Sequence, residues 1–269
     1  MIRRPAVAGR FYPAEQAALR NELRDMTHGK KPPAEPRGLA LMVPHAGYVY
    51  SGRVAAATYT SVRLPSRVVV LCPNHTGQGE PIAVMDRGSW ELPLGMAPID
   101  NPLATAILAR CASARVDEEA HRAEHSLVVQ IPFLQFLVED LRFVPICVGT
   151  MRLTLLLELG RAVGDAIRAD GGEVLLVISS DMSHYVPVEE AERQDRKALD
   201  RVLALDPEGL HSVVLREEIS MCGVAPAVAG LEAARQLGAR QGRLVTYATS
   251  GDKNGDYQSV VGYAGVAVT

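Results

Sequence analysis

Three histidines in this chain each follow an apolar run that is typical of a buried β-strand. They are His45, His75 and His184, and the runs before them are 39–43, 67–72 and 174–178. Short apolar runs bounded by Pro and Gly indicate strands that are buried on both faces. Because ligands of open α/β sheets bind at the carboxyl ends of the strands, we expect the three imidazoles to converge on one site. Imidazole binds Zn, Fe, Cu and Ni, so the sequence indicates a metal site. The alternative is that these are loop histidines with structural hydrogen bonds.

Asp181 shares a short segment with His184. A carboxylate beside an imidazole can select its tautomer and raise its basicity. We therefore predict that Asp181 and His184 act in acid–base chemistry or support a metal ligand. In the plainer interpretation, Asp181 caps the following helix and His184 faces solvent.

Cys222 stands at the predicted start of a helix, where the helix dipole lowers the pKa of a thiol. It is therefore a candidate metal ligand or nucleophile. The alternative is a buried cysteine that packs as a small apolar residue. The other cysteines, Cys72, Cys111 and Cys147, are scattered and form no CxxC pair, which favours a reducing cytoplasmic compartment.

Four further residues are candidates for substrate contact. Asn74 precedes His75 and could orient a substrate or the imidazole, and Tyr50 lies in the glycine-containing loop after His45. Glu124 and His125 precede a predicted amphipathic helix, where a glutamate also suits the helix dipole. The sequence leaves open whether this pair contacts substrate, supports the site or only caps the helix.

The predicted elements alternate between strands and helices. The expected helices are 14–28, one that begins near Ser51 as its N-cap, 101–112, 125–138, 153–169, 188–204, 207–216 and 222–237. The expected further strands are 142–148, 244–249 and 260–268, with a hairpin or two short strands within 82–94. This order predicts one α/β domain over residues 1–269, with a largely parallel central sheet, flanking helices and an antiparallel pair at the C-terminus.

The composition excludes several classes of protein. The formal net charge is −3, charged residues make up 22% and hydrophobic residues 48%, and no block of like charge stands out. We therefore expect no nucleic-acid partner and no membrane partner. No apolar stretch is long enough to span a bilayer, and no apolar segment follows the basic residues at the start as in a secretory signal. The segment 252–256 resembles the start of a calcium loop but lacks the required glycine and glutamate further on.

Several motifs together resemble the Memo family, whose bacterial and archaeal members are called AmmeMemoRadiSam system protein B. The matching segments are 4–13, 44–48, 73–75, 124–126, 180–185, 222–223 and 250–252. They span nearly the whole chain in the family's order. The resemblance implies a fold similar to that of class III extradiol dioxygenases, in which two histidines and a glutamate hold iron(II) and a further histidine acts as acid and base.

Carried over by motif, the resemblance implies that His45 and His75 are metal ligands and that Cys222 is the third ligand in place of a carboxylate. His184, with Asp181, corresponds to the acid–base group. A thiolate is softer than a carboxylate and favours copper(I), zinc or an iron with altered redox properties, and it is open to oxidation. We expect iron(II) or copper(I), with zinc less favoured.

The resemblance implies a dioxygenase-like oxidoreductase that acts on a small substrate. One alternative is a non-catalytic binding or metal-handling protein with a vestigial site, and another is a hydrolase with a zinc-bound water. The family's name implies association with a radical-SAM protein and an AMMECR1-type protein. The expected ligand is a small molecule or a peptide, and a homodimer is the statistical default.

Overall fold

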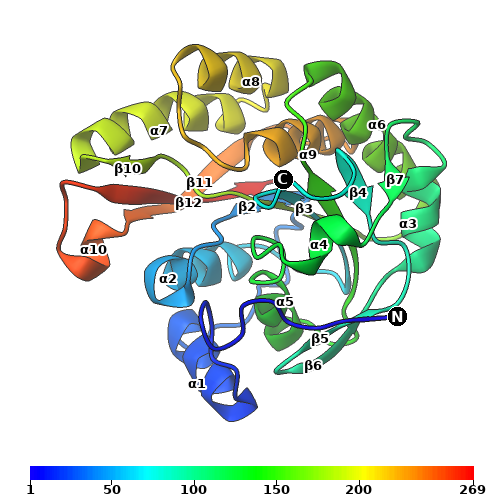
Figure 1. Cartoon of the computed structure of the whole chain (residues 1–269), viewed down its shortest axis with the longest axis horizontal. Coiled ribbons are helices and arrows are strands. Elements are labelled where there is room, and N and C mark those ends of the chain that lie inside the picture. The colour runs from blue at the N-terminus through cyan, green and yellow to red at the C-terminus, as the bar shows by residue number, and fades with distance from the viewer.

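A mixed nine-stranded sheet runs through the centre of the protein (Figure 1). The computed structural model describes residues 1–269. The strands of this sheet are β2 (Ala40–Val43), β3 (Arg67–Pro73), β4 (Ile82–Val84), β7 (Arg115–Val116), β8 (Arg142–Val148), β9 (Leu175–Ser179), β10 (His184–Val186), β11 (Gly242–Thr249) and β12 (Val260–Val268). They are ordered β10-β12-β2-β9-β3-β8-β4-β7, and β11 pairs with β12. The predicted α/β class and the antiparallel pairing of the last two strands are confirmed.

The four central strands, β2, β9, β3 and β8, are parallel to one another. Successive side chains along them enter opposite layers of the core, as the pleat requires. Met42 and Ile178 face one apolar cluster, whereas Leu41 and Val177 face the other. Because helices cover both faces, these strands are apolar along nearly their whole length, which explains the unbroken hydrophobic runs in the sequence.

Ten helices surround the sheet (Figure 1). They are α1 (Gln16–Thr27), α2 (Tyr48–Tyr59), α3 (Asn101–Leu108), α4 (Glu119–Arg122), α5 (Ile131–Leu137), α6 (Leu153–Asp170), α7 (Val188–Leu203), α8 (Pro207–Arg216), α9 (Val224–Gln236) and α10 (Gly251–Asn254). Helices α3 and α6 to α9 pack on one face, and α1, α2 and α5 pack on the other. None of the helices has the length and apolar character needed to cross a membrane.

The order of the central strands explains how distant histidines meet. The strands β2, β9 and β3 are neighbours, and their carboxyl ends lie at the same edge of the sheet. His45 follows β2, Asp181 follows β9 and His75 follows β3. The topology therefore brings these three side chains to one edge of the sheet. His184, the third histidine of the prediction, lies on the edge strand β10 instead of directly behind β9.

The prediction that Ser51 caps a helix is wrong, because α2 already begins at Tyr48 with Gly47 as its N-cap. The Tyr48 backbone N–H donates to the Phe11 carbonyl at 2.8 Å, and the Ser51 hydroxyl donates back to the Ala46 carbonyl at 3.0 Å. The loop that carries His45 is therefore short and tied at both ends.

The predicted helix 125–138 is also wrong over its first half, since α5 covers only Ile131–Leu137. The Glu124 carboxylate accepts hydrogen bonds from the backbone N–H and the hydroxyl of Ser126 at 2.9 and 2.7 Å. Such local side-chain bonds compete with helix formation. Pro132 then suits the first turn of the helix that follows.

The segment 82–94 contains two short strands, as one of the predicted alternatives stated, but they do not form a hairpin with each other. Strand β4 joins the main sheet antiparallel to β8. Strand β5 (Ser89–Leu92) pairs with β6 (Gly95–Pro98) and with β1 (Ile2–Arg3) in a separate small sheet. Strands β1, β7 and β10 were not predicted, because runs of two or three residues give too little pattern.

Arg67, at the start of β3, forms a salt bridge with Asp170 whose contribution to stability can be tested. Arg67 donates to the Asp170 carboxylate at 2.5 and 3.1 Å, and these bonds hold the pKa of Asp170 below its usual value. A carboxylate with a lowered pKa stabilises the fold above its unfolded pKa and loses this contribution as the pH falls. We expect Asp170→Asn to lower the free energy of unfolding at neutral pH by about 1 kcal/mol. The loss should shrink below about pH 4.

Urea unfolding at neutral and acidic pH measures this difference. Asp165→Asn is the matched control, since Asp165 is on the same helix and more than half exposed. An equal loss of unfolding free energy for Asp170→Asn at both pH values would contradict a stabilising role for the ionised Asp170 carboxylate.

Candidate metal centre

His45 is buried directly behind β2, and its tautomer is fixed by a hydrogen-bond network. Its Nδ1 lies 2.9 Å from the Ser179 hydroxyl oxygen. That hydroxyl donates its one proton to the Ser126 carbonyl at 2.6 Å, so it must accept from His45. Nδ1 therefore carries the proton and Nε2 presents its lone pair. Burial and the neighbouring imidazoles lower the pKa of His45 well below its usual value, which keeps the ring neutral.

His75 follows β3 and is oriented by Glu124. The Glu124 carboxylate accepts from the His75 backbone N–H at 2.6 Å and from its Nδ1–H at 2.9 Å. Burial alone would raise the pKa of Glu124, but the bonds from His75 and Ser126 lower it to about 2. The ionised carboxylate leaves Nε2 of His75 free as a ligand, as in the carboxylate–histidine–metal arrangement.

His125 completes a group of three imidazoles. Its ring stacks on that of His75 with centroids 4.6 Å apart, and it lies edge-on to His45 at 5.6 Å. Each of the three rings offers a nitrogen, and these nitrogens all lie within 4.8 Å of one another. His125 was predicted to contact substrate, and the structure places it in a group that could hold a metal ion.

Cys222, which the family resemblance implies as a third ligand, lies against His45 and outside this group of three imidazoles. Its Sγ is 3.2 Å from His45 Nε2 and accepts from the Asp181 backbone N–H at 3.3 Å. Burial and the nearby Asp181 raise the pKa of the thiol well above its usual value. The sulfur is therefore a thiol in the metal-free protein, and a bound cation would deprotonate it.

The approach of Cys222 to His45 requires a glycine at position 223. A Cβ there would overlap the Ser180 side chain and lie 2.5 Å from the Ser179 carbonyl oxygen. The Gly223 N–H donates to the Ser180 hydroxyl at 3.2 Å. This close contact holds the turn before α9 against the end of β9.

Asp181 and His184 both line the cavity in front of these ligands, but they are not paired as predicted. Asp181 is buried and accepts from the His45 backbone N–H at 2.7 Å, and burial raises its pKa to about 6. The His184 Nδ1–H donates to the Ser220 carbonyl at 2.9 Å. Ser220, rather than Asp181, therefore fixes the His184 tautomer and leaves its Nε2 free to exchange a proton.

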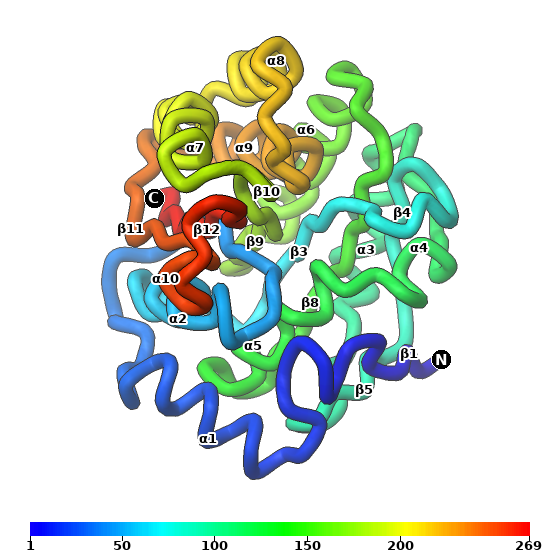
Figure 2. Tube along the Cα trace, turned by 60° about the vertical axis from the view of Figure 1, so that its left-hand side comes forward, coloured from blue at the N-terminus to red at the C-terminus, as the bar shows by residue number.

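The cavity has a volume of about 570 Å³. Besides the three imidazoles, Asp181 and His184, its wall consists of Phe11, Ala46, Gly47, Tyr50, Tyr185, Ser250, Asn254, Ser259, Val261 and Tyr263. Tyr50, predicted to contact substrate, is in the cavity wall. In Figure 2 the start of α2 lies close to α10, and both elements contribute residues to this wall.

Two predicted substrate-contact residues do not line the cavity. Asn74 holds its own loop, because its side chain accepts from Thr76 and Gly77 and donates to the Gln78 carbonyl. Glu124 is buried, and both its oxygens are bonded to His75 or Ser126. The structure therefore places both residues behind the ligands.

Several residues that position the ligands could not be recognised from sequence patterns. Ser179 and Ser220 fix imidazole tautomers, and the Gln130 amide donates to the Ser179 hydroxyl at 2.9 Å. These roles depend on contacts between residues far apart in the chain. Tyr185 stands out only in the structure, because it is 77% exposed at the cavity with a φ of 58°, which is unusual for a bulky residue.

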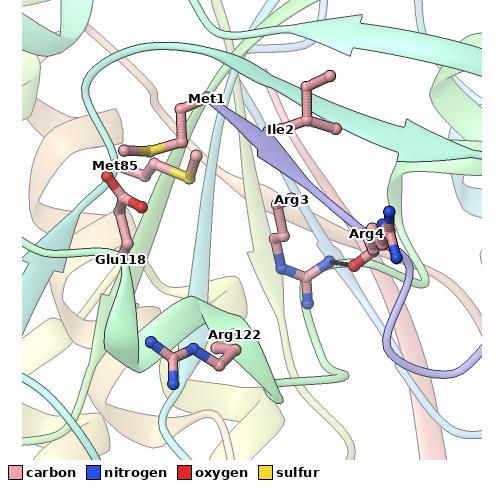
Figure 3. A pocket seen from close by; sticks show the side chains of 7 residues that line it. All are labelled: Met1, Ile2, Arg3, Arg4, Met85, Glu118 and Arg122. Carbon is pink, nitrogen blue, oxygen red and sulfur yellow. Dashed lines mark hydrogen bonds between the residues drawn. The ribbon is translucent and has the colours of Figure 1, made fainter.

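Arg3 is a positioning residue that supports the loop carrying Glu124 and His125. Figure 3 shows Arg3, on the first strand, next to Arg4. Arg3 is 7% exposed, and its guanidinium lies 3.9 Å from the centre of the Trp90 ring. It donates to the carbonyls of His121 and Glu124 at 2.6 and 2.8 Å. Because Arg3 lies on β1, the pairing of β1 with β5 supports the loop that carries Glu124 and His125.

We expect Arg3→Met to lower the affinity for metal by about tenfold, the lower end of the range for residues that orient ligands. Loss of the donors leaves two buried carbonyls unpaired, so the free energy of unfolding should also fall by about 1–3 kcal/mol. Metal titration below the unfolding transition separates the two effects. Arg4→Met is the control, because Arg4 is an exposed neighbour. Unchanged metal affinity in Arg3→Met would refute the positioning role.

Known proteins are similar in sequence to this chain over nearly its whole length. The family described as Memo-like protein matches residues 3–267. A MEMO1 family protein of Aquifex aeolicus is 44% identical over 266 residues, with 98% of each chain covered. MEMO1 family proteins of Methanothermobacter thermautotrophicus and Methanopyrus kandleri are each 42% identical, and the matches cover 98% and 99% of this chain and 99% and 98% of theirs. The chain therefore belongs to the Memo-like protein family.

Proposed function

We propose that this protein binds a redox metal, iron(II) or copper(I), through His45, His75 and Cys222. We further propose that it uses the metal in a dioxygenase-like oxidation of a small substrate. The observation that carries this proposal is the convergence of two imidazoles that are each held through Nδ1, with a sulfur 3.2 Å from Nε2 of His45.

The separation of the Cys222 sulfur from the nearest imidazole nitrogen fits bonds from both atoms to one ion. Metal–nitrogen and metal–sulfur bonds of about 2.0 and 2.3 Å, at angles of about 90–110°, put the two donors roughly 3.1–3.6 Å apart. The separation of 3.2 Å between Cys222 Sγ and His45 Nε2 falls in this range. His125 offers a further nitrogen within 4.8 Å of those of His45 and His75. A soft thiolate with imidazoles suits copper(I), iron and zinc, and we favour the redox metals.

The residues around the cavity supply the other requirements of an oxidation. A bound iron or copper ion would supply one-electron redox chemistry at this point. His184 Nε2, free in the cavity wall, accepts a proton from a substrate hydroxyl and returns it. Phe11 and Tyr263 provide apolar walls that orient a small organic molecule.

The alternative function is non-catalytic binding or handling of a metal ion. The observation that favours it is the thiol beside His45, where the resemblance to class III extradiol dioxygenases implies a carboxylate. A thiolate binds soft ions tightly and is itself oxidised by oxygen chemistry nearby. We propose a reducing, cytoplasmic compartment in either case, because all four cysteines are free thiols.

Anaerobic loading with iron(II), followed by oxygen-uptake assays with catechols and other small reductants, separates these functions. For the oxidoreductase, we expect substrate-dependent oxygen uptake that His184→Gln reduces while the metal stays bound. His28→Asn is the control, since His28 is exposed in a left-handed conformation that asparagine tolerates. Bound metal with no uptake would favour the metal-handling function, and no metal under any reducing condition would contradict both.

A further inference from the structure

We infer that the ligand of this cavity carries an anionic group, a carboxylate or a phosphate, which binds to Arg10 and Arg122 just outside the metal centre. The inference deepens the proposed function and rests on it, because it assigns the other end of the ligand to the metal cavity. It adds an anion subsite that the metal ligands do not include.

The subsite is a surface depression of about 580 Å³ beside the metal cavity. Phe11 and His125 line both hollows, and their rings lie 4.9 Å apart. The depression is otherwise lined by Arg10, Arg122 and small apolar residues, and no acidic residue takes part. A ligand seated at the metal would therefore pass the edge of these two rings to reach the arginines.

The distribution of charge favours binding of an anion in the depression beside Arg10 and Arg122. None of the residues that line the metal cavity is a lysine or arginine, and its one carboxylate is Asp181. Among the ion pairs of the protein, Arg10 takes part in none. Arg122 pairs only with Glu119 on its own helix and is 74% exposed. Exposed pairs of this kind are weak, so Arg122 remains able to bind a ligand.

The loop that carries Arg10 is held in place before any ligand arrives. The N–H groups of Arg10 and Phe11 donate to the Val7 carbonyl at 3.0 and 2.9 Å, and Gly9, with a φ of 81°, donates to Tyr12 at 2.7 Å. The Phe11 carbonyl accepts from Tyr48 at the start of α2. The backbone that carries Arg10 is therefore fixed beside Phe11, and a planar guanidinium is suited to paired hydrogen bonds with a carboxylate or phosphate.

A second pocket, lined by arginines and by Glu118, shares Arg122 with this depression. It has a volume of about 210 Å³, and its other arginines are Arg3 and Arg4 (Figure 3). Arg4 lines only that second pocket, so it is a local control for the general effect of removing a positive charge.

The test compares two catechol probes on the protein loaded with iron(II) and kept anaerobic. One probe carries a carboxylate on an alkyl chain of graded length, and the other carries the neutral carboxamide. By calorimetry we expect the carboxylate to bind about tenfold more tightly at the best length. Arg10→Gln and Arg122→Gln should each reduce this ratio, and Arg4→Gln should leave it unchanged. Equal affinities at all lengths, or a ratio that Arg10→Gln does not change, would overturn the subsite.

A second measurement separates failure of the subsite from failure of the metal site. If the carboxamide probe does not bind the loaded protein, the proposed function fails. The subsite is then tested without metal, by the rate at which phenylglyoxal modifies each arginine with and without inorganic phosphate. Slower modification of Arg10 but not of Arg4 supports the subsite, and equal slowing or none overturns it.

Discussion

Replacing His75 with alanine is expected to abolish stoichiometric binding of iron(II), and replacing Glu124 with glutamine to weaken it by about 10- to 100-fold. The Glu124 carboxylate accepts four hydrogen bonds, from the backbone and side chain of both His75 and Ser126. An amide at this position would place an NH₂ group against one of those donors. The His75 ring would then lose the orientation that presents its Nε2 to the metal.

Anaerobic desalting followed by metal analysis measures the stoichiometry, and competition with a chelator measures the affinity. Glu119→Gln is the matched control, because Glu119 is a half-buried glutamate of α4 that pairs only with Arg122. If Glu124→Gln binds iron as tightly as the wild-type protein, His75 is not held by Glu124 for metal binding.

Replacing Gly223 with alanine is expected to destabilise the fold and to separate Cys222 from His45. The added Cβ meets the Ser180 side chain and the Ser179 carbonyl oxygen, and a backbone atom cannot move aside as the end of a flexible side chain can. Overpacking of this kind costs about 1–3 kcal/mol. Urea unfolding measures the stability, and metal affinity below the transition reports the position of the sulfur.

Gly47→Ala is the stability control, since a Cβ at Gly47 would have only ordinary contacts, 3.8 Å from Phe11. Its free energy of unfolding should stay close to that of the wild-type protein. Wild-type stability and metal affinity in Gly223→Ala would show that the turn before α9 has room to adjust and does not fix Cys222.

The central sheet could be predicted because its strands are buried on both faces. Their apolar runs are unbroken, and prolines or glycines mark their ends, so the strand boundaries were correct to within a residue or two. The exits of β2 and β3 then placed His45 and His75 at one edge. The proximity of Cys222 to His45 followed from the family resemblance, and helix periodicity alone would not have found it.

The segment before α5 could not be predicted from periodicity. Its apolar residues repeat as in a helix, but the Glu124 carboxylate takes up the Ser126 N–H and the chain turns instead. Local patterns do not record that His75, far away in sequence, supplies two more donors to the same carboxylate. For this reason His125 was expected to contact substrate, whereas it lies among the metal-capable imidazoles.

The tautomers of the site histidines could not be predicted from the sequence either. Asp181 is close to His184 along the chain and was expected to orient it, but the Ser220 carbonyl performs this role. Asp181 instead accepts from the His45 backbone and shares contacts with Cys222. These assignments depend on which atoms are buried together, which only the three-dimensional arrangement determines.

The most direct test of the account is the absorption spectrum of the protein loaded with cobalt(II) in the absence of oxygen. A thiolate ligand gives cobalt a sulfur-to-metal charge-transfer band, which imidazoles do not produce. We predict that the wild-type protein shows this band, that Cys222→Ser loses it and that His125→Ala keeps it. Cobalt bound without the band, and released by His125→Ala but not by Cys222→Ser, would contradict the ligand set of His45, His75 and Cys222.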